Sequence, residues 1–333
     1  METGEMKNCF HYRCRISIVM LLAVLCMAVS GSVSPISILL VHPEGKNFTA
    51  VVKGITDDLG SEGVVHELIV DDQTNKHSIN TAMKKYKPMV IVLLDNVAIR
   101  CYREYVLELP DSITVQPSII LMGIMVEKAI IGIRNAEAIS YEIPIVTSAV
   151  NLRTISGLPI TKIGVVNREL MDDLIMRNKE SCSREGISIV SRSLPDKKRT
   201  MSVDIRKALD ELFTKEMVDA LWIPNDNKLL TPYLVTSVWI PKIKQYHKPV
   251  IVGLEALADP KLDFGTLAVL PDHESLGAQA ASLIISARKT GWVVESGRVD
   301  PSISVYKILN HRQAARLFDV QDKNIIGIDK VLK

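Results

Sequence analysis

The sequence has few of the residues that mark nucleic-acid interfaces or disulfide-rich proteins. Aromatic side chains make up only 5% of its 333 residues, so a base-stacking surface is not expected. The formal net charge of +2 provides no electrostatic basis for binding nucleic acid. Only Cys101 and Cys182 follow the N-terminal segment. Two cysteines without neighbouring histidines do not predict a metal site, so we expect two free, buried thiols and no metal ion.

Several catalytic signatures are missing as well. The chain has no G-x-G-x-x-G or G-x-x-x-x-G-K phosphate loop and no G-x-S-x-G nucleophile elbow. No cofactor is therefore expected. These absences favour a binding protein over an enzyme.

The N-terminus has the pattern of an export signal. Lys7, Arg13 and Arg15 precede the uncharged apolar run from Ile16 to Val29, which small residues follow. The run is shorter than the roughly 20 residues that span a membrane. We interpret residues 1–32 as a signal peptide and expect a periplasmic or extracytoplasmic protein. An uncleaved membrane anchor is the alternative.

After this segment, short apolar runs alternate with helical patterns. Continuous apolar runs are typical of buried parallel strands, and their alternation with helices predicts βαβ units. The alternation of strands and helices restarts after Pro159, which indicates two similar doubly wound α/β lobes. The chain is expected to cross from the first lobe to the second near Ser140–Glu142. The main expected strands are Ile36–Val41, Val64–Val70, Met89–Leu94, Ser118–Gly123, Lys162–Val166, Ile187–Ser193, Ala220–Ile223, Pro249–Val252, Gly265–Leu270 and Ser302–Leu309.

Several of these stretches, in this order, resemble one family. The chain is similar to substrate-binding proteins of bacterial ABC transporters with the type I periplasmic binding protein fold, and in particular to tryptophan-binding components. The resemblance covers nearly all of Ile36 to Val320. It rests on Ser118–Met122, Ala138–Glu142, Lys162–Asn167, Trp222–Asn227, Pro249–Ile251, Glu255–Leu257, Asp272, Gly277–Ala281, Leu309–Asn310 and Ala314–Ala315.

The resemblance implies two lobes joined by a multi-strand hinge. The N-terminal lobe is expected to comprise residues 33–140 and 271–298, and the C-terminal lobe residues 141–270 and 299–333. It also implies a monomer that closes on a small organic ligand, such as an aromatic or branched amino acid, and delivers it to an ABC permease in the inner membrane. A sensory module that signals to a membrane kinase is the alternative.

Two loops depart from the family pattern where ligand contact is expected. Asp95-Asn96-Val97-Ala98 replaces the usual small and hydroxyl residues, and the loop after Met122 lacks the usual Asp-Pro. The ligand of the family therefore does not transfer to this chain.

Candidate ligand contacts in the first lobe follow the expected strands, because ligands of open α/β sheets bind outside the carboxyl ends of strands. The first loop gives His42, Asn47 and Phe48, with a solvated turn as the alternative. Asp95 and Asn96 either contact ligand or cap a helix. Met122 completes the set in this lobe, and Tyr141 is a candidate at the crossing between the lobes.

Candidate contacts in the second lobe are mostly Asn and Asp residues at strand ends. Asp226 is suited to pair with an amino group of a ligand, and Asx turns are the alternative reading of the whole set. The candidates are Asn167, Asn225, Asp226, Asn227 and Glu255.

Overall fold

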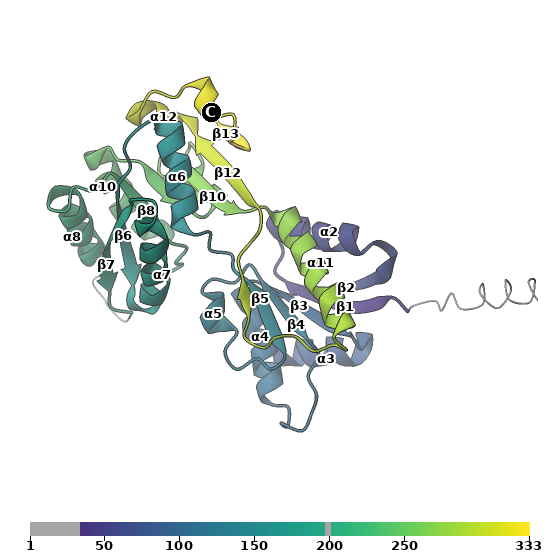
Figure 1. Ribbon diagram of the computed structural model, residues 1–333. Helices are drawn as coiled ribbons and strands as arrows, with labels where there is room; N and C mark the ends of the chain where they lie inside the picture. Colours follow the sequence, from purple (N-terminus) through teal and green to yellow (C-terminus); the bar gives the residue numbers. More distant parts are fainter. Residues whose placement is uncertain (1–33, 197–200) are drawn as a thin grey trace, which may run out of the picture.

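The computed structural model describes residues 34–196 and 201–333, which form two α/β lobes (Figure 1). The predicted signal peptide lies outside the described residues. The first lobe is built on a six-stranded sheet in the order β11-β5-β4-β3-β1-β2, in which every pair is parallel. Its strands are β1 (Ile36–His42), β2 (Gly63–Ile69), β3 (Val90–Leu94), β4 (Ser118–Leu121), β5 (Ala136–Ile139) and β11 (Val299–Asp300). Its helices are α2 (Lys46–Leu59), α3 (Lys76–Tyr86), α4 (Asp95–Leu107), α5 (Val126–Ala129) and α11 (His273–Lys289).

The second lobe is built on a seven-stranded sheet in the order β13-β12-β10-β9-β8-β6-β7. Only the β10–β12 pair is antiparallel. Its strands are β6 (Lys162–Arg168), β7 (Ser188–Leu194), β8 (Ala220–Ile223), β9 (Val250–Val252), β10 (Leu267–Pro271), β12 (Val305–Asn310) and β13 (Lys330–Leu332). Its helices are α6 (Ile145–Ser156), α7 (Asp172–Ser183), α8 (Met201–Thr214), α9 (Pro232–Leu234), α10 (Ile240–Tyr246) and α12 (His311–Leu317).

Each sheet has a hydrophobic core on both of its faces. In β1, Leu39 and Val41 pack into one core of the first lobe, and Ile38 and Leu40 pack into the other. Side chains of a strand alternate between faces, so a strand buried on both sides must be apolar throughout. The same arrangement explains the apolar runs of the second sheet, whose two cores include the buried Trp222 and Trp239. The predicted pair of doubly wound sheets is confirmed.

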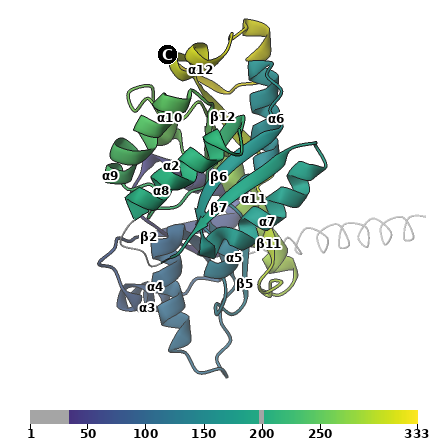
Figure 2. The ribbon, with the colours of Figure 1, turned by 90° about the vertical axis from the view of Figure 1, so that its left-hand side faces the viewer.

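Three segments connect the two sheets, and the lobes lie end to end (Figure 2). The first connection, residues 140–144, runs from β5 to α6. The second passes from β10 through Asp272 to α11, and the third, residues 301–304, joins β11 to β12. The predicted lobe boundaries remain predictions. Sheet pairing favours small changes to them, because Pro271 belongs to β10 and Val299–Asp300 pairs with β5.

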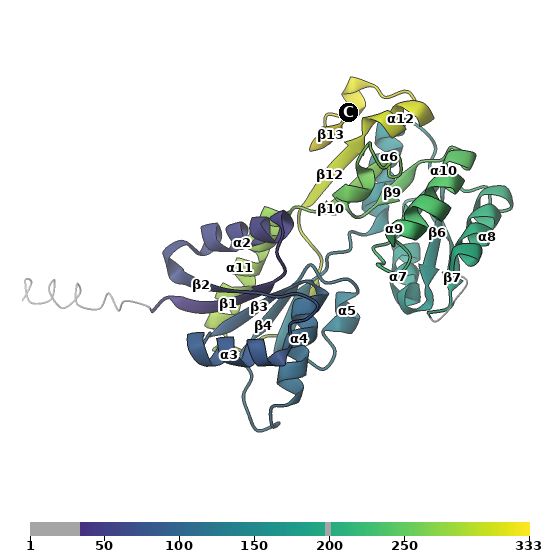
Figure 3. The same ribbon diagram turned by 180° about the vertical axis from the view of Figure 1, so that it is seen from behind.

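Helices α2 and α11 lie side by side in the first lobe (Figure 3). They meet at two glycines. A Cβ atom on Gly54 would lie 2.1 Å from the carbonyl oxygen of Glu274, and one on Gly277 would lie 2.3 Å from that of Val51. Only hydrogen can occupy these positions without moving the backbones apart. The middle of α2 is thereby held against the beginning of α11, next to the second connection.

Some elements differ from the sequence-based expectation. The stretch expected as one helix from about Leu230 to Gln245 is α9 and α10 with a π-helical turn, Val235–Trp239, between them. Strands β5, β11 and β13 were not predicted. Cys101 and Cys182 are buried and free, as expected.

Candidate ligand-binding site

A cavity of about 360 Å³ lies between the lobes. The first lobe lines it at the starts of α2 and α4 and along the loop after β4. The first connection and the loops after β8 and β9 complete its wall. These are the carboxyl ends of parallel strands, where ligands of open α/β sheets bind. The lining residues are Gly45, Lys46, Asn47, Phe48, Asp95, Met122, Ile124, Tyr141, Asn225, Asn227 and Leu254.

The start of α2 supplies the positive side of the cavity. Gly45 precedes the helix with φ of 150°, and no side chain of the described residues caps this end. Lys46, Asn47 and Phe48 form the first turn, which contains no acidic residue. A helix N-terminus presents unpaired N–H groups and partial positive charge, so it favours an anionic group. Lys46 adds a full positive charge at the same place.

Asp95 supplies a negative charge from the start of α4. Its backbone has φ of 82°, a strained conformation for a residue other than glycine. Its Oδ1 accepts a hydrogen bond from the N–H of Val97 at 2.9 Å, so the residue caps the helix and lines the cavity at once. Burial raises the pKa of the Asp95 carboxyl, and the charge of Asp72 adds to the rise. A cationic ligand group would offset this cost.

Tyr141 lies on the first connection and joins it to the second. Its Oη lies 3.0 Å from Nε2 of His273, the first residue of α11, and the two rings are stacked at 5.9 Å. Burial raises the pKa of the Tyr141 hydroxyl and lowers that of His273. Tyr141, Phe48 and Met122 add apolar surface to the lining of the cavity.

The second lobe contributes amide groups. Asn225 is 6% exposed, and its Oδ1 has no hydrogen-bond partner among the described residues. The Asn225 side chain packs on Gly253, where a Cβ atom would lie 2.6 Å from Oδ1. A buried acceptor without a partner is costly unless a ligand or water satisfies it. Asn227 lines the same wall.

Asp226, placed between these two asparagines, does not line this cavity. Its carboxylate forms a two-point ion pair with Arg168, with Nε to Oδ2 at 2.7 Å and an Nη to Oδ1 at 3.0 Å. Oδ1 also accepts from the N–H of Lys228 at 2.9 Å. Asp226 is 2% exposed and Arg168 8%. The ion pair therefore holds the loop Asn225–Asn227 in place, and the Asp226 carboxylate is already bonded to Arg168 and Lys228.

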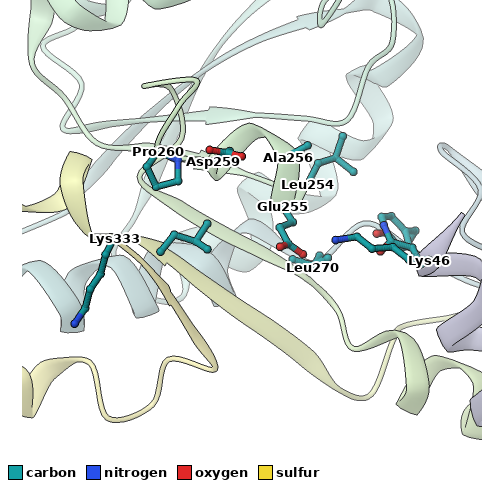
Figure 4. Close-up of a pocket in the computed structure, with 11 residues that line it drawn as sticks. Lys46, Leu254, Glu255, Ala256, Asp259, Pro260, Leu270 and Lys333 are labelled. Atoms are coloured by element: carbon teal, nitrogen blue, oxygen red, sulfur yellow. The ribbon is translucent and has the colours of Figure 1, made fainter.

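Four other predicted contacts lie around the cavity without lining it. His42 is buried and bonded to Pro43 and Glu67, and Asn167 is buried against Asp172. Asn96 bonds the backbone of Ile124. Glu255 lies in a second cavity of about 450 Å³, which shares Lys46, Asn47, Tyr141 and Leu254 with the first (Figure 4). It pairs there with Lys330 at 2.7 Å, which lowers the pKa of its carboxyl.

The structure brings together seven of the predicted contacts and adds residues that sequence reasoning did not select. The seven are Asn47, Phe48, Asp95, Met122, Tyr141, Asn225 and Asn227. Lys46 was not selected, although it lies in the same loop after the first expected strand as the selected Asn47 and Phe48. Ile124 and Leu254 were not selected either. Among the described residues, no cluster of His, Cys, Asp or Glu is arranged to hold a metal ion.

Several solved structures have a fold similar to that of this chain. A ligand-free, open structure of a substrate binding protein with adhesive properties from Clostridium difficile is 15% identical, with a TM-score of 0.63 over 89% of this chain and 99% of the other. The chain has the type I periplasmic binding protein fold. An ABC domain from Streptococcus pneumonia in complex with L-Trp is 16% identical, with a TM-score of 0.56 over 89% of this chain and 100% of the other. A periplasmic ribose ABC transporter from Conexibacter woesei is 15% identical, with a TM-score of 0.52 over 86% and 98%.

Sequence comparison finds less. No family model and no curated protein sequence matches this chain. Within residues 34–196 and 201–333, no helix is both long enough and apolar enough to cross a membrane.

Proposed function

We propose that this protein is the extracytoplasmic solute-binding component of an ABC importer, and that it binds an amino acid with an aromatic or branched side chain. The observation that carries the proposal is the distribution of charge in the cavity. Lys46 and the N-terminus of α2 lie on its wall with the Asp95 carboxylate, and Phe48, Met122 and Leu254 are apolar lining residues. A zwitterion with an apolar side chain satisfies all three features.

The proposed roles follow from these groups. The ligand carboxylate binds Lys46 and the N–H groups of α2. The ligand ammonium group binds Asp95 and donates to Oδ1 of Asn225. The apolar side chain packs on Phe48 and Tyr141. Because Asp95 and Asn225 belong to different lobes, the ligand bridges them and favours a closed arrangement over an open one.

The proposal also covers where the protein acts and which protein it delivers its ligand to. The protein acts outside the cytoplasm as a monomer and presents its ligand to an ABC permease, without catalysing a reaction. The folds of the binding proteins described above support this role.

The test begins with mass spectrometry of small molecules released from the purified protein. Titration calorimetry with tryptophan, tyrosine, phenylalanine, leucine, isoleucine and valine then measures affinity. We expect at least one to bind with a dissociation constant in the micromolar range or below. Binding of a sugar, or of none of these amino acids, would refute the amino-acid assignment.

A further inference from the structure

The loop between β4 and α5, residues Met122–Met125, contacts both lobes. Met122 and Ile124 line the cavity. The side chain of Met125 is buried in a core of the second lobe, with Ile145 and Met171. Met122 and Met125 have φ of 55° and 54°, a left-handed conformation that is unfavourable for non-glycine residues. Surrounding contacts must therefore hold this loop in place.

One set of such contacts comes from the first lobe. The side chain of Asn96 brackets the backbone of Ile124: Oδ1 accepts from its N–H at 3.0 Å and Nδ2 donates to its carbonyl at 3.4 Å. Asn96, predicted from sequence as a ligand contact, thus does not line the cavity but bonds the backbone of Ile124, which does.

A second contact comes from the first connection between the lobes. The N–H of Met125, the next residue, donates to Oε1 of Glu142 at 2.7 Å. Ser140 donates to Oε2 of the same carboxylate at 3.3 Å. A backbone N–H bonded to a carboxylate is among the stronger hydrogen bonds in proteins. The lining residue Ile124 is thereby held from both sides.

Helix α5, which follows the loop, lies on the side of the first lobe that faces α7 (Figure 1). Glu127 pairs with Arg177 at 2.9 Å, and Lys128 lies 3.5 Å from Asp173. These pairs are largely exposed, and exposed pairs contribute little to stability. Lys128 also donates to the carbonyl of Leu170. These contacts join α5 to the second lobe, whereas the Glu142 contact joins the loop itself to the first connection.

We propose that Glu142 is a positioning residue that holds the cavity-lining loop Met122–Met125 against the first connection. Rotation of one lobe on the other displaces Glu142 relative to this loop, so ligand contact at Ile124 is coupled to the arrangement of the lobes. The effect on affinity rests on the proposed function, whereas the effect on the backbone does not.

The first experiment measures hydrogen exchange of the ligand-free protein by mass spectrometry. Glu142→Ala removes the acceptor, so we expect faster exchange in peptides that contain the Met125 amide and no change in α2. Glu142→Gln keeps an acceptor oxygen and should restore most of the protection. The matched control is Glu127→Ala, which removes a carboxylate of α5 and should leave that amide protected. Unchanged exchange in Glu142→Ala overturns the proposal.

The second experiment measures affinity by calorimetry with the same six amino acids. We expect Glu142→Ala to weaken binding about tenfold, with Glu142→Gln and Glu127→Ala close to wild type. Wild type that binds none of the six refutes the amino-acid assignment of the proposed function, and the exchange data then decide the Glu142 contact alone. Faster exchange with unchanged affinity would show that the loop does not position the ligand, and would overturn the proposal.

Discussion

The two lobes support their halves of the cavity in different ways. In the first lobe, α2 is placed by direct backbone contact with α11 at Gly54 and Gly277. In the second, the loop Asn225–Asn227 is placed by the buried ion pair of Arg168 and Asp226. Neither support lies in the cavity wall. A steric contact depends only on shape, whereas a buried ion pair depends on both partners remaining present and charged. We therefore expect different substitutions to disrupt the two halves of the cavity.

The largest effect is expected from breaking the ion pair. Asp226→Ala leaves Arg168 buried with Asp196, at 3.2 Å, as its one charged partner among the described residues. We expect a loss of about 4 kcal/mol in the free energy of unfolding, measured by urea denaturation, because a buried charge that loses its paired carboxylate is costly.

Two variants control this experiment. Lys330→Ala, which breaks the more exposed pair with Glu255, should cost less than about 1 kcal/mol. Combined Arg168→Met and Asp226→Leu should recover most of the loss, because both charges are gone. A single Asp226→Ala variant as stable as Lys330→Ala would show that the pair is not a support.

The steric support gives the next largest effect. Gly54→Ala places a methyl group against the carbonyl of Glu274 and should destabilise the protein by about 3 kcal/mol. Gly327→Ala, whose Cβ would meet nothing closer than 3.8 Å, is the matched control. Added salt should not alter the loss in the free energy of unfolding caused by Gly54→Ala. A loss that depends on salt would remove the contrast between the two lobes.

A smaller effect is expected in the cavity itself. Asp95→Asn should weaken amino-acid binding at least tenfold, or about 1.4 kcal/mol, because the ammonium group loses its charged partner. The free energy of unfolding should stay equal or rise, since burial disfavours the Asp95 charge. Calorimetry and urea denaturation measure the two quantities. Glu44→Gln, in the exposed loop before α2, should change neither, and equal affinity of Asp95→Asn would remove Asp95 from the site.

The smallest effect concerns His273, the first residue of α11, which contacts Tyr141 on the first connection. Burial lowers the pKa of His273 below its usual 6.5, so the neutral ring is favoured in the folded state. Its stabilising contribution is present above pH 6.5 and is lost as pH falls through the lowered pKa. His273→Gln should remove this part of the pH dependence of unfolding, measured by urea denaturation across that window. Parallel curves for the two proteins would contradict the assignment.

Most strands of the two sheets carry a run of apolar residues that the sequence shows, whereas the strands that were missed do not. The core strands β1, β3 and β4 are continuous apolar runs and were recognised. Strand β5 was missed because the buried Glu137 interrupts its run, and β11 and β13 are only two and three residues long. Such short edge strands are defined by their neighbours and not by their own pattern.

The candidate site shows the same limit. Seven of the residues predicted as ligand contacts line the cavity, but the sequence could not distinguish lining residues from residues that hold the lining in place. Asp226 was interpreted as a ligand contact because its partner, Arg168, lies 58 positions away. Asn96 was interpreted in the same way, although it holds a loop 28 positions further on. Long-range pairing of this kind leaves no trace in local spacing.

The location of Trp222 has a practical consequence. It is 7% exposed and lines a small space of about 20 Å³ beneath the cleft, with Tyr141 and Asn225. Trp239 is fully enclosed, and Trp292 lies at the opposite end of the first lobe's strands. We therefore expect the fluorescence of Trp222 to respond when a ligand occupies the cavity, while that of Trp239 and Trp292 stays constant. Ligand binding can then be followed by intrinsic fluorescence without a dye.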